Sequence, residues 1–131
     1  MTSDKGPMTK DKTALLLIAH GSRQDEANAD LIDLVAEMRK KGEYPVVEGA
    51  YLELSTPTIE EACARCVAQG AERVVLLPYF LSAGVHVRLD LTAFRRKLAD
   101  SYPGVEFSLA EPLGPHPLIL EIVALRARQA K

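Results

Sequence analysis

The chain has 131 residues, of which 47% are hydrophobic and 26% charged, and its formal net charge is -2. These values predict a single soluble globular domain, and the charge argues against nonspecific nucleic-acid binding. No apolar run approaches the about 20 residues needed to span a bilayer, so no membrane association is expected. The start, residues 1–12, is polar and has no apolar segment, so we do not expect it to be a secretory signal. We expect it to be a flexible tail on a domain over residues 13–131, in the cytoplasm.

The first predicted element is a strand followed directly by polar turn residues. Six consecutive apolar residues, 14–19, are typical of a strand buried on both faces in a parallel sheet. The sequence HGSR (residues 20–23) follows at once, and Ser22 with Asp25 matches a capping box that would open a helix. His20 is therefore predicted at the carboxyl end of a strand, the edge of an open α/β sheet where ligands bind.

The rest of the chain alternates between apolar runs and helical periodicity. Further strands are predicted over 46–54, 73–81 and 105–109. Helical spacing of apolar residues marks the segments 27–38, 57–69, 86–98 and 118–129. The order βαβαβαβα predicts an α/β fold with a four-stranded parallel sheet, strand order 2-1-3-4, and helices on both faces.

Two histidines are expected to meet at the carboxyl edge of this sheet. His20 follows the first strand and His86 the third, and in the order 2-1-3-4 these strands are neighbours about 4.8 Å apart. Two neutral imidazoles can hold a divalent metal or accept protons. Glu53 follows the second strand, where a solvated carboxylate is an equally good interpretation. His116, between two prolines ahead of the last helix, is interpreted as structural.

The two cysteines form a C-x-x-C pattern inside a predicted helix. Thr56 and Pro57 are interpreted as its N-cap and first residue, which places Cys63 and Cys66 well beyond the helix start. They share an apolar face, so buried, unreactive thiols are favoured over a redox or zinc site. The chain has neither a P-loop nor the glycine pattern of dinucleotide-binding proteins.

Three blocks resemble the small sirohydrochlorin chelatases. They are AHGSR (19–23), AYLEL (50–54) with Pro57, and PYFLSAGVHV (78–87) with Asp90, in the order of that family. The similarity extends over about residues 13–129. It implies a chelatase-like three-layer module, two of which face one another, so a chain of this length would form a homodimer.

The resemblance also implies a reaction. It is the ATP-independent insertion of a divalent metal (Co²⁺, Fe²⁺ or Ni²⁺) into sirohydrochlorin, for cobalamin or sirohaem biosynthesis, with no further cofactor. His20 and His86 would be the catalytic and metal-binding residues, with Glu53 assisting. A non-catalytic carrier of divalent metal or tetrapyrrole with the same fold is the alternative.

The carboxylates of sirohydrochlorin call for cationic partners. Arg23 and Arg88 flank the two histidines in sequence and are predicted to bind the substrate, together with Ser22 and Gly84 on the same loops. Solvated arginines at helix starts are an equally good interpretation of both.

Overall fold

The computed structural model describes residues 12–131. Its elements are β1 (Thr13–Ala19), α1 (Asp25–Lys41), β2 (Val46–Tyr51), α2 (Ile59–Ala68), β3 (Arg73–Pro78), α3 (Val85–Ser101), β4 (Glu106–Leu109) and α4 (Pro117–Gln129). Every predicted element is present, although the second and third strands end three residues earlier than predicted. The predicted tail lies, apart from Lys12, outside the described residues.

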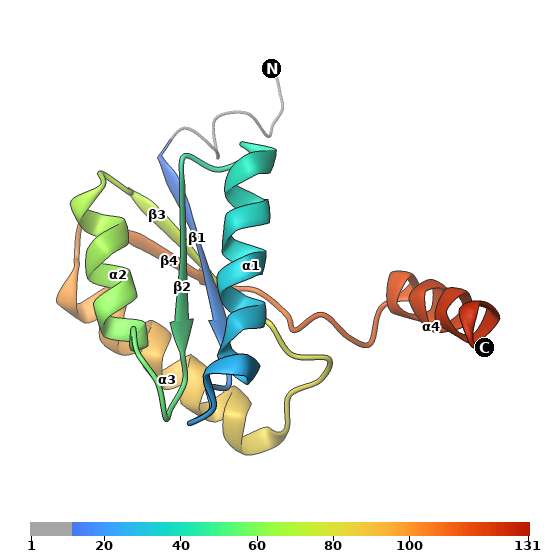
Figure 1. Cartoon of the computed structure of the whole chain (residues 1–131). Helices are drawn as coiled ribbons and strands as arrows, with labels where there is room; N and C mark the ends of the chain where they lie inside the picture. Colours follow the sequence, from blue (N-terminus) through green and yellow to red (C-terminus); the bar gives the residue numbers. More distant parts are fainter. Residues whose placement is uncertain (1–11) are drawn as a thin grey trace.

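The four strands form one parallel sheet in the order β2-β1-β3-β4, which confirms the predicted topology. Strand β1 is central, and its residues 13–18 are all buried, as an unbroken apolar run requires. Helix α1 covers one face of the sheet, while α2 and α3 cover the other (Figure 1). The carboxyl ends of β1, β2 and β3 therefore share one edge, which we call the carboxyl edge.

The sheet separates two apolar clusters. Alternate residues of β1, such as Leu16, pack with α2 and α3, where Leu91 is fully buried. The intervening residues, such as Leu15, pack beneath α1. Helix α1 lies close to β2 at Gly49, where a Cβ atom would come within 2.9 Å of Val35 Cγ2. This close approach sets how α1 sits over the sheet and where its first turn lies relative to the carboxyl edge.

The start of α1 differs from the prediction. Its N-cap is Gln24, which makes no side-chain capping hydrogen bond, so the proposed Ser22–Asp25 capping box is wrong. The Ser22 hydroxyl instead accepts a hydrogen bond from the Gln24 backbone N–H at 3.1 Å. The Ser22 hydroxyl thus bonds the backbone two residues further on, within the turn that precedes the helix, and not the first turn of α1.

The start of α2 was also misplaced. The N-cap is Thr58 rather than Thr56, and it forms a complete capping box with Glu61. Pro57 still belongs to the loop before the helix, because its carbonyl accepts a hydrogen bond from the Tyr51 N–H at 2.9 Å. That bond delays the helix by two residues.

Helix α4 extends away from the rest of the molecule (Figure 1) and has no buried residue. His116 is its N-cap, and the His116 Nδ1 accepts a hydrogen bond from the Leu118 N–H at 3.1 Å. His116 thus has the structural role expected from its position. Within residues 12–131, no helix combines the length and apolar character needed to cross a membrane.

Candidate active site

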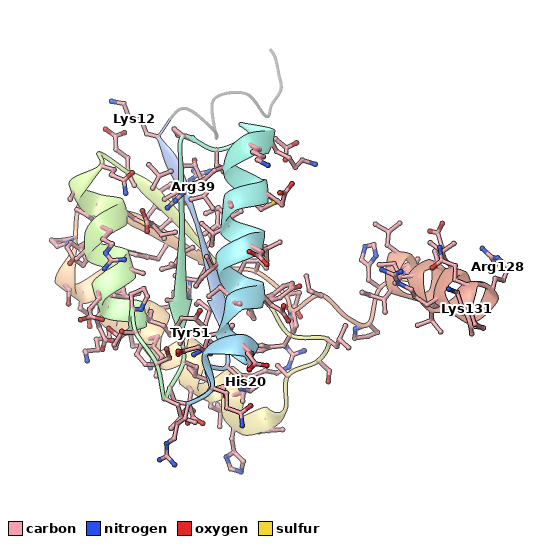
Figure 2. All side chains as sticks on the ribbon, in the orientation of Figure 1. Lys12, His20, Arg39, Tyr51, Arg128 and Lys131 are labelled. Atoms are coloured by element: carbon pink, nitrogen blue, oxygen red, sulfur yellow. The ribbon has the colours of Figure 1, made fainter. Side chains whose placement is uncertain are left out.

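His20 lies just beyond β1 at the carboxyl edge, at the opposite end of the strand from Lys12 (Figure 2). The ladder between β1 and β2 continues past both strands. The Leu52 N–H donates to the Ala19 carbonyl at 2.8 Å, and the Glu53 N–H donates to the His20 carbonyl at 3.0 Å. These two bonds fix the backbone of His20 next to that of Glu53, so both predicted site residues lie at the same edge. Both side chains are exposed.

Gly21 makes this close approach possible. Its φ is +96°, in the region that favours glycine, and a Cβ atom here would overlap the Glu53 carbonyl oxygen. The chain can therefore turn sharply after His20 only if residue 21 has no side chain. The sequence placed Gly21 in a turn, and the structure shows that it is also a contact between two loops.

Phe80 supports the His20 side chain from the direction of β3. The two rings stack with centroids 4.2 Å apart and an angle of 24° between their planes. Phe80 is 5% exposed, so the imidazole rests on a fixed surface while remaining open to solvent. The sequence analysis did not single out Phe80. The sequence feature that could have identified Phe80 is its position, two residues beyond an apolar strand, at the edge where the histidines were expected.

Asn28 is a second residue that the sequence analysis missed. It is a buried polar side chain on α1, and it holds the Ser22 backbone from both sides. The Ser22 N–H donates to Asn28 Oδ1 at 3.0 Å, and Asn28 Nδ2 donates to the Ser22 carbonyl at 2.8 Å. Asn28 Nδ2 also donates to Ser55 Oγ at 3.1 Å, which ties the loop after β1 to the loop after β2. The sequence feature that could have identified Asn28 is a polar residue on the apolar face of an amphipathic helix.

Tyr51 completes this buried network. Its hydroxyl donates to the Asn28 carbonyl at 2.8 Å, and burial raises the pKa of the tyrosine. The hydroxyl therefore remains a protonated donor at neutral pH. A pocket of about 260 Å³ lies beside it, lined by His20, Asn28, Tyr51 and Tyr79 among others.

His86 is the second residue of α3, whose N-cap is Gly84, so it lies at a helix N-terminus as predicted. It is exposed and follows β3, the neighbour of β1. The topology thus places His20 and His86 after adjacent strands. In residues 12–131, however, no three His, Cys, Asp or Glu side chains come together as a metal-binding cluster. His20, His86 and Glu53 therefore do not form a three-ligand site in this chain.

The two predicted arginines differ in their surroundings. Arg23 is exposed on the loop that carries His20. Arg88 Nε donates to the Ala83 carbonyl at 3.2 Å, and its Nη1 lies 3.4 Å from Glu111 Oε1. The hydrogen bond from Arg88 thus stabilises the loop before α3, whereas its ion pair with Glu111 is exposed and weak.

The cysteines lie away from this edge, on α2. Cys63 and Cys66 are free thiols with no exposed surface. Burial, followed by the charge of Glu60, raises the pKa of Cys63 to about 11. Burial also raises the pKa of Cys66 to about 12. The structure confirms that both are buried, and the protonated thiols are poor nucleophiles and poor metal ligands.

Comparison with known proteins assigns the family. The model of the CbiX family matches residues 14–130, nearly the whole chain. This chain belongs to the CbiX family. The CbiX-family chain is 39% identical to the chloroplastic sirohydrochlorin ferrochelatase of Arabidopsis thaliana over 113 residues, which is 86% of this chain and 50% of that protein.

It is also 30% identical to the sirohydrochlorin cobaltochelatase of Sulfolobus acidocaldarius, over 88% of this chain and 90% of that protein. The chain spans about half the length of the first curated relatives it matches, and nearly all of others.

Solved structures agree with the fold of this CbiX-family chain. The sirohydrochlorin chelatase SirB from Bacillus subtilis subspecies spizizenii, in complex with cobalt, matches with a TM-score of 0.83 and 30% identity, over 90% of this chain and 50% of that one. A CbiX protein from Marinobacter aquaeolei described as a putative cobalamin biosynthesis protein matches with a TM-score of 0.75 and 29% identity, over 90% of this chain and 99% of that one.

Proposed function

We propose that this CbiX-family chain inserts a divalent metal, Co²⁺ or Fe²⁺, into sirohydrochlorin without ATP. The observation that carries the proposal is the carboxyl edge itself. There His20 is held by the Glu53 backbone and by the Phe80 ring, and His86 follows the adjacent strand. The names of curated relatives, both ferrochelatases and cobaltochelatases, support the same reaction and both metals.

Metal insertion into a tetrapyrrole requires a group that binds the metal and a group that accepts protons. Metal insertion forms four bonds from the metal to ring nitrogens and releases the two protons carried by the metal-free ring. An exposed neutral imidazole can bind the incoming ion or accept a proton, and we assign these roles to His20 and His86. Glu53 assists as a nearby carboxylate. The reaction needs no cofactor beyond the metal, which is a substrate.

The absence of a three-ligand cluster in residues 12–131 suits a transient metal. A closed set of protein ligands would compete with the ring nitrogens, whereas two histidines leave coordination positions open for them. Neither imidazole nor carboxylate selects strongly between Co²⁺, Fe²⁺ and Ni²⁺, and we expect all three to be inserted.

In this proposal, positively charged side chains on the loops after β1 and β3 bind the substrate. Arg23 and Arg88 attract its carboxylates, and Ser22 and Gly84 shape the loops that carry them. Arg88 exchanges its exposed partner Glu111 for a substrate carboxylate at little cost. The positive N-terminal end of α3 adds to the attraction.

A second copy of the chain supplies the opposite wall of the site. The pocket at His20 holds about 260 Å³, whereas ligand sites that enclose a drug-sized molecule span about 300–1,000 Å³ and a tetrapyrrole is larger still. One carboxyl edge therefore offers a surface rather than an enclosure. We accordingly propose a homodimer in which two carboxyl edges face each other across the macrocycle.

The test is a spectral titration of the purified protein with sirohydrochlorin and Co²⁺ or Fe²⁺, without ATP. The absorption spectrum should shift to that of the metallated ring over many turnovers per chain. His116→Asn, which keeps a good N-cap, is the matched histidine control and should retain full activity. Binding that stops at one equivalent without metallation would favour the carrier instead.

A further inference from the structure

The pocket beside His20 lies on the side of the sheet that α1 covers. His20 and Tyr51 line it at the carboxyl edge, next to the first turns of α1 (Figure 2). Its residues Leu31 and Tyr51 belong to the apolar cluster beneath α1, whereas Phe80 belongs to the cluster beneath α2 and α3. The imidazole of His20 thus has the Phe80 ring on one side and this pocket, which we call the α1 pocket, on the other.

The α1 pocket has the size of a hydrated metal ion. Each water molecule takes up about 30 Å³, so a divalent ion with six waters needs about 180 Å³. The pocket, with about 260 Å³, can hold such an ion, whereas a tetrapyrrole is too large for it. The smaller of the two proposed substrates therefore fits the α1 pocket, and the larger one does not.

The charges around the α1 pocket favour a cation. Asp30 lines the pocket, and no lysine or arginine in the described part of the chain does. The first turn of α1, next to the pocket, carries two further acids, Asp25 and Glu26. The two arginines that we assign to the substrate carboxylates are not part of the pocket wall. The negative potential of these carboxylates attracts a divalent ion to the pocket, and hence to His20.

The direct approach to His20 from solvent is covered during the proposed reaction. In the proposed function, on which this inference rests, the macrocycle lies on the carboxyl edge and a second copy of the chain covers its far side. Arg23 and Arg88 would also repel a cation there. The α1 pocket opens elsewhere, because Ala27 and Asp30 in its wall are exposed on α1. An ion that enters beside these two residues reaches His20 without crossing the macrocycle.

We propose that the α1 pocket is the entrance for the divalent metal ion and that Asp30 attracts the ion into it. The ion enters with its waters, exchanges some of them for the His20 imidazole, and passes on to the ring nitrogens. A single carboxylate holds such an ion only weakly. Since no three-ligand cluster exists within residues 12–131, nothing in the described chain retains the ion on its way. Asp30 therefore determines the affinity for the metal and not that for the tetrapyrrole.

Steady-state kinetics of Asp30→Asn tests the role of this carboxylate. The variant should raise the KM for Co²⁺ at least about threefold, because the neutral amide no longer attracts the ion. The KM for sirohydrochlorin should stay at the native value. Asp33→Asn is the matched control, since it removes the same charge from an exposed position on α1 that lies outside the pocket. An equal KM for Co²⁺ in the two variants would overturn the role of Asp30.

Blocking the pocket gives an independent test. Ala27→Trp places a large ring at an exposed helix position in the pocket wall, which the fold tolerates. At Co²⁺ concentrations below the KM, insertion should slow at least about fivefold, while the KM for sirohydrochlorin stays native. Ala36→Trp makes the same change on α1 outside this pocket and should keep the native rate. Circular dichroism checks that both variants fold. A native rate in Ala27→Trp would overturn the entrance.

The entrance and the proposed function fail in different ways. A native chain that inserts no metal into sirohydrochlorin would refute the proposed function, and this inference with it. A native chain that inserts Co²⁺, together with Asp30→Asn and Ala27→Trp variants that behave like their controls, would refute only the entrance. A higher KM for Co²⁺ in Asp30→Asn and slower insertion in Ala27→Trp, each with an unchanged KM for sirohydrochlorin, would support it.

Discussion

The imidazole of His20 rests on the ring of Phe80, with centroids 4.2 Å apart, although four secondary-structure elements, α1 to β3, lie between the two residues in sequence. The contact joins the loop after β1 to the loop after β3, the two loops that carry the predicted histidines. It restricts the His20 side chain without covering it. The contribution of this stack to activity can be measured by replacing Phe80 with leucine, which keeps most of the apolar volume but has no flat ring.

We expect Phe80→Leu to lower the rate of metal insertion by about 2- to 13-fold, which corresponds to the about 0.5–1.5 kcal/mol of an aromatic stack. The measurement is the initial rate with sirohydrochlorin and Co²⁺. Phe94→Leu, which changes the same residue type on α3 away from His20, is the control for lost packing. Equal rates for Phe80→Leu and the native chain would show that the stack does not position His20.

The proposed ligands predict a graded loss of activity. His20→Ala and His86→Ala should each reduce the rate by about 100-fold or more, the range for losing a positioned acid, base or ligand. Both side chains are exposed, so circular dichroism and thermal unfolding should stay close to those of the native chain. Glu53→Gln should cost less than either histidine. A histidine variant with native turnover would have no part in the mechanism.

Gly21→Ala should be far more harmful than the same substitution at Gly70, a glycine with nearly the same φ angle. Gly70 has a φ of +94° and open space around it, so Gly70→Ala should cost only the about 1–3 kcal/mol of a left-handed non-glycine residue. Gly21→Ala adds the overlap with the Glu53 carbonyl oxygen and should displace the loops after β1 and β2. Chemical denaturation and the insertion rate measure the two effects. Equal losses for the two variants would contradict the proposed loop contact.

Asn28 is expected to position His20 through the Ser22 backbone. Asn28→Ala leaves a partly buried N–H and carbonyl of Ser22 without partners, at about 1–3 kcal/mol for each group. Both stability and the insertion rate should fall. The control Gln69→Ala removes a side-chain amide that makes two hydrogen bonds at the C-cap of α2, at the other end of the sheet. It should lower stability alone. A rate unchanged by Asn28→Ala would limit Asn28 to a structural role.

The buried thiols predict a loss of stability in alkaline solution. In the unfolded chain the thiols ionise near pH 9.0, whereas the folded chain holds the pKa of Cys63 at about 11 and that of Cys66 at about 12. Above pH 9 the unfolded chain loses protons that the folded chain keeps. The free energy of unfolding should then fall by up to about 1.4 kcal/mol per pH unit for each thiol.

Urea denaturation at pH 8, 9 and 10 would measure this effect. The double variant Cys63→Ala with Cys66→Ala is the control: it should be less stable at pH 8, decline less steeply above pH 9, and still insert metal. Parallel declines in the two proteins would contradict a contribution from the thiols.

The order of the elements and the edge that carries the site could be read from the amino-acid sequence. The apolar run 14–19 is long enough to require a central strand, and helical periodicity separates each strand from the next. Right-handed crossovers then allow few strand orders, so the sequence alone assigns His20 and His86 to the ends of neighbouring strands, as the structure confirms. These inferences depend on local periodicity and on general chain topology.

Only the tertiary structure decided how that edge is built. The Phe80 ring, the Asn28 amide and the Glu53 carbonyl act on residues distant in sequence, and no local pattern records which side chain will face which loop. The true N-caps, Gln24 and Thr58, were set by loop hydrogen bonds that local capping preferences did not anticipate. Periodicity identified α4 as a helix, but its direction depends on backbone contacts that hold the preceding loop against the carboxyl edge.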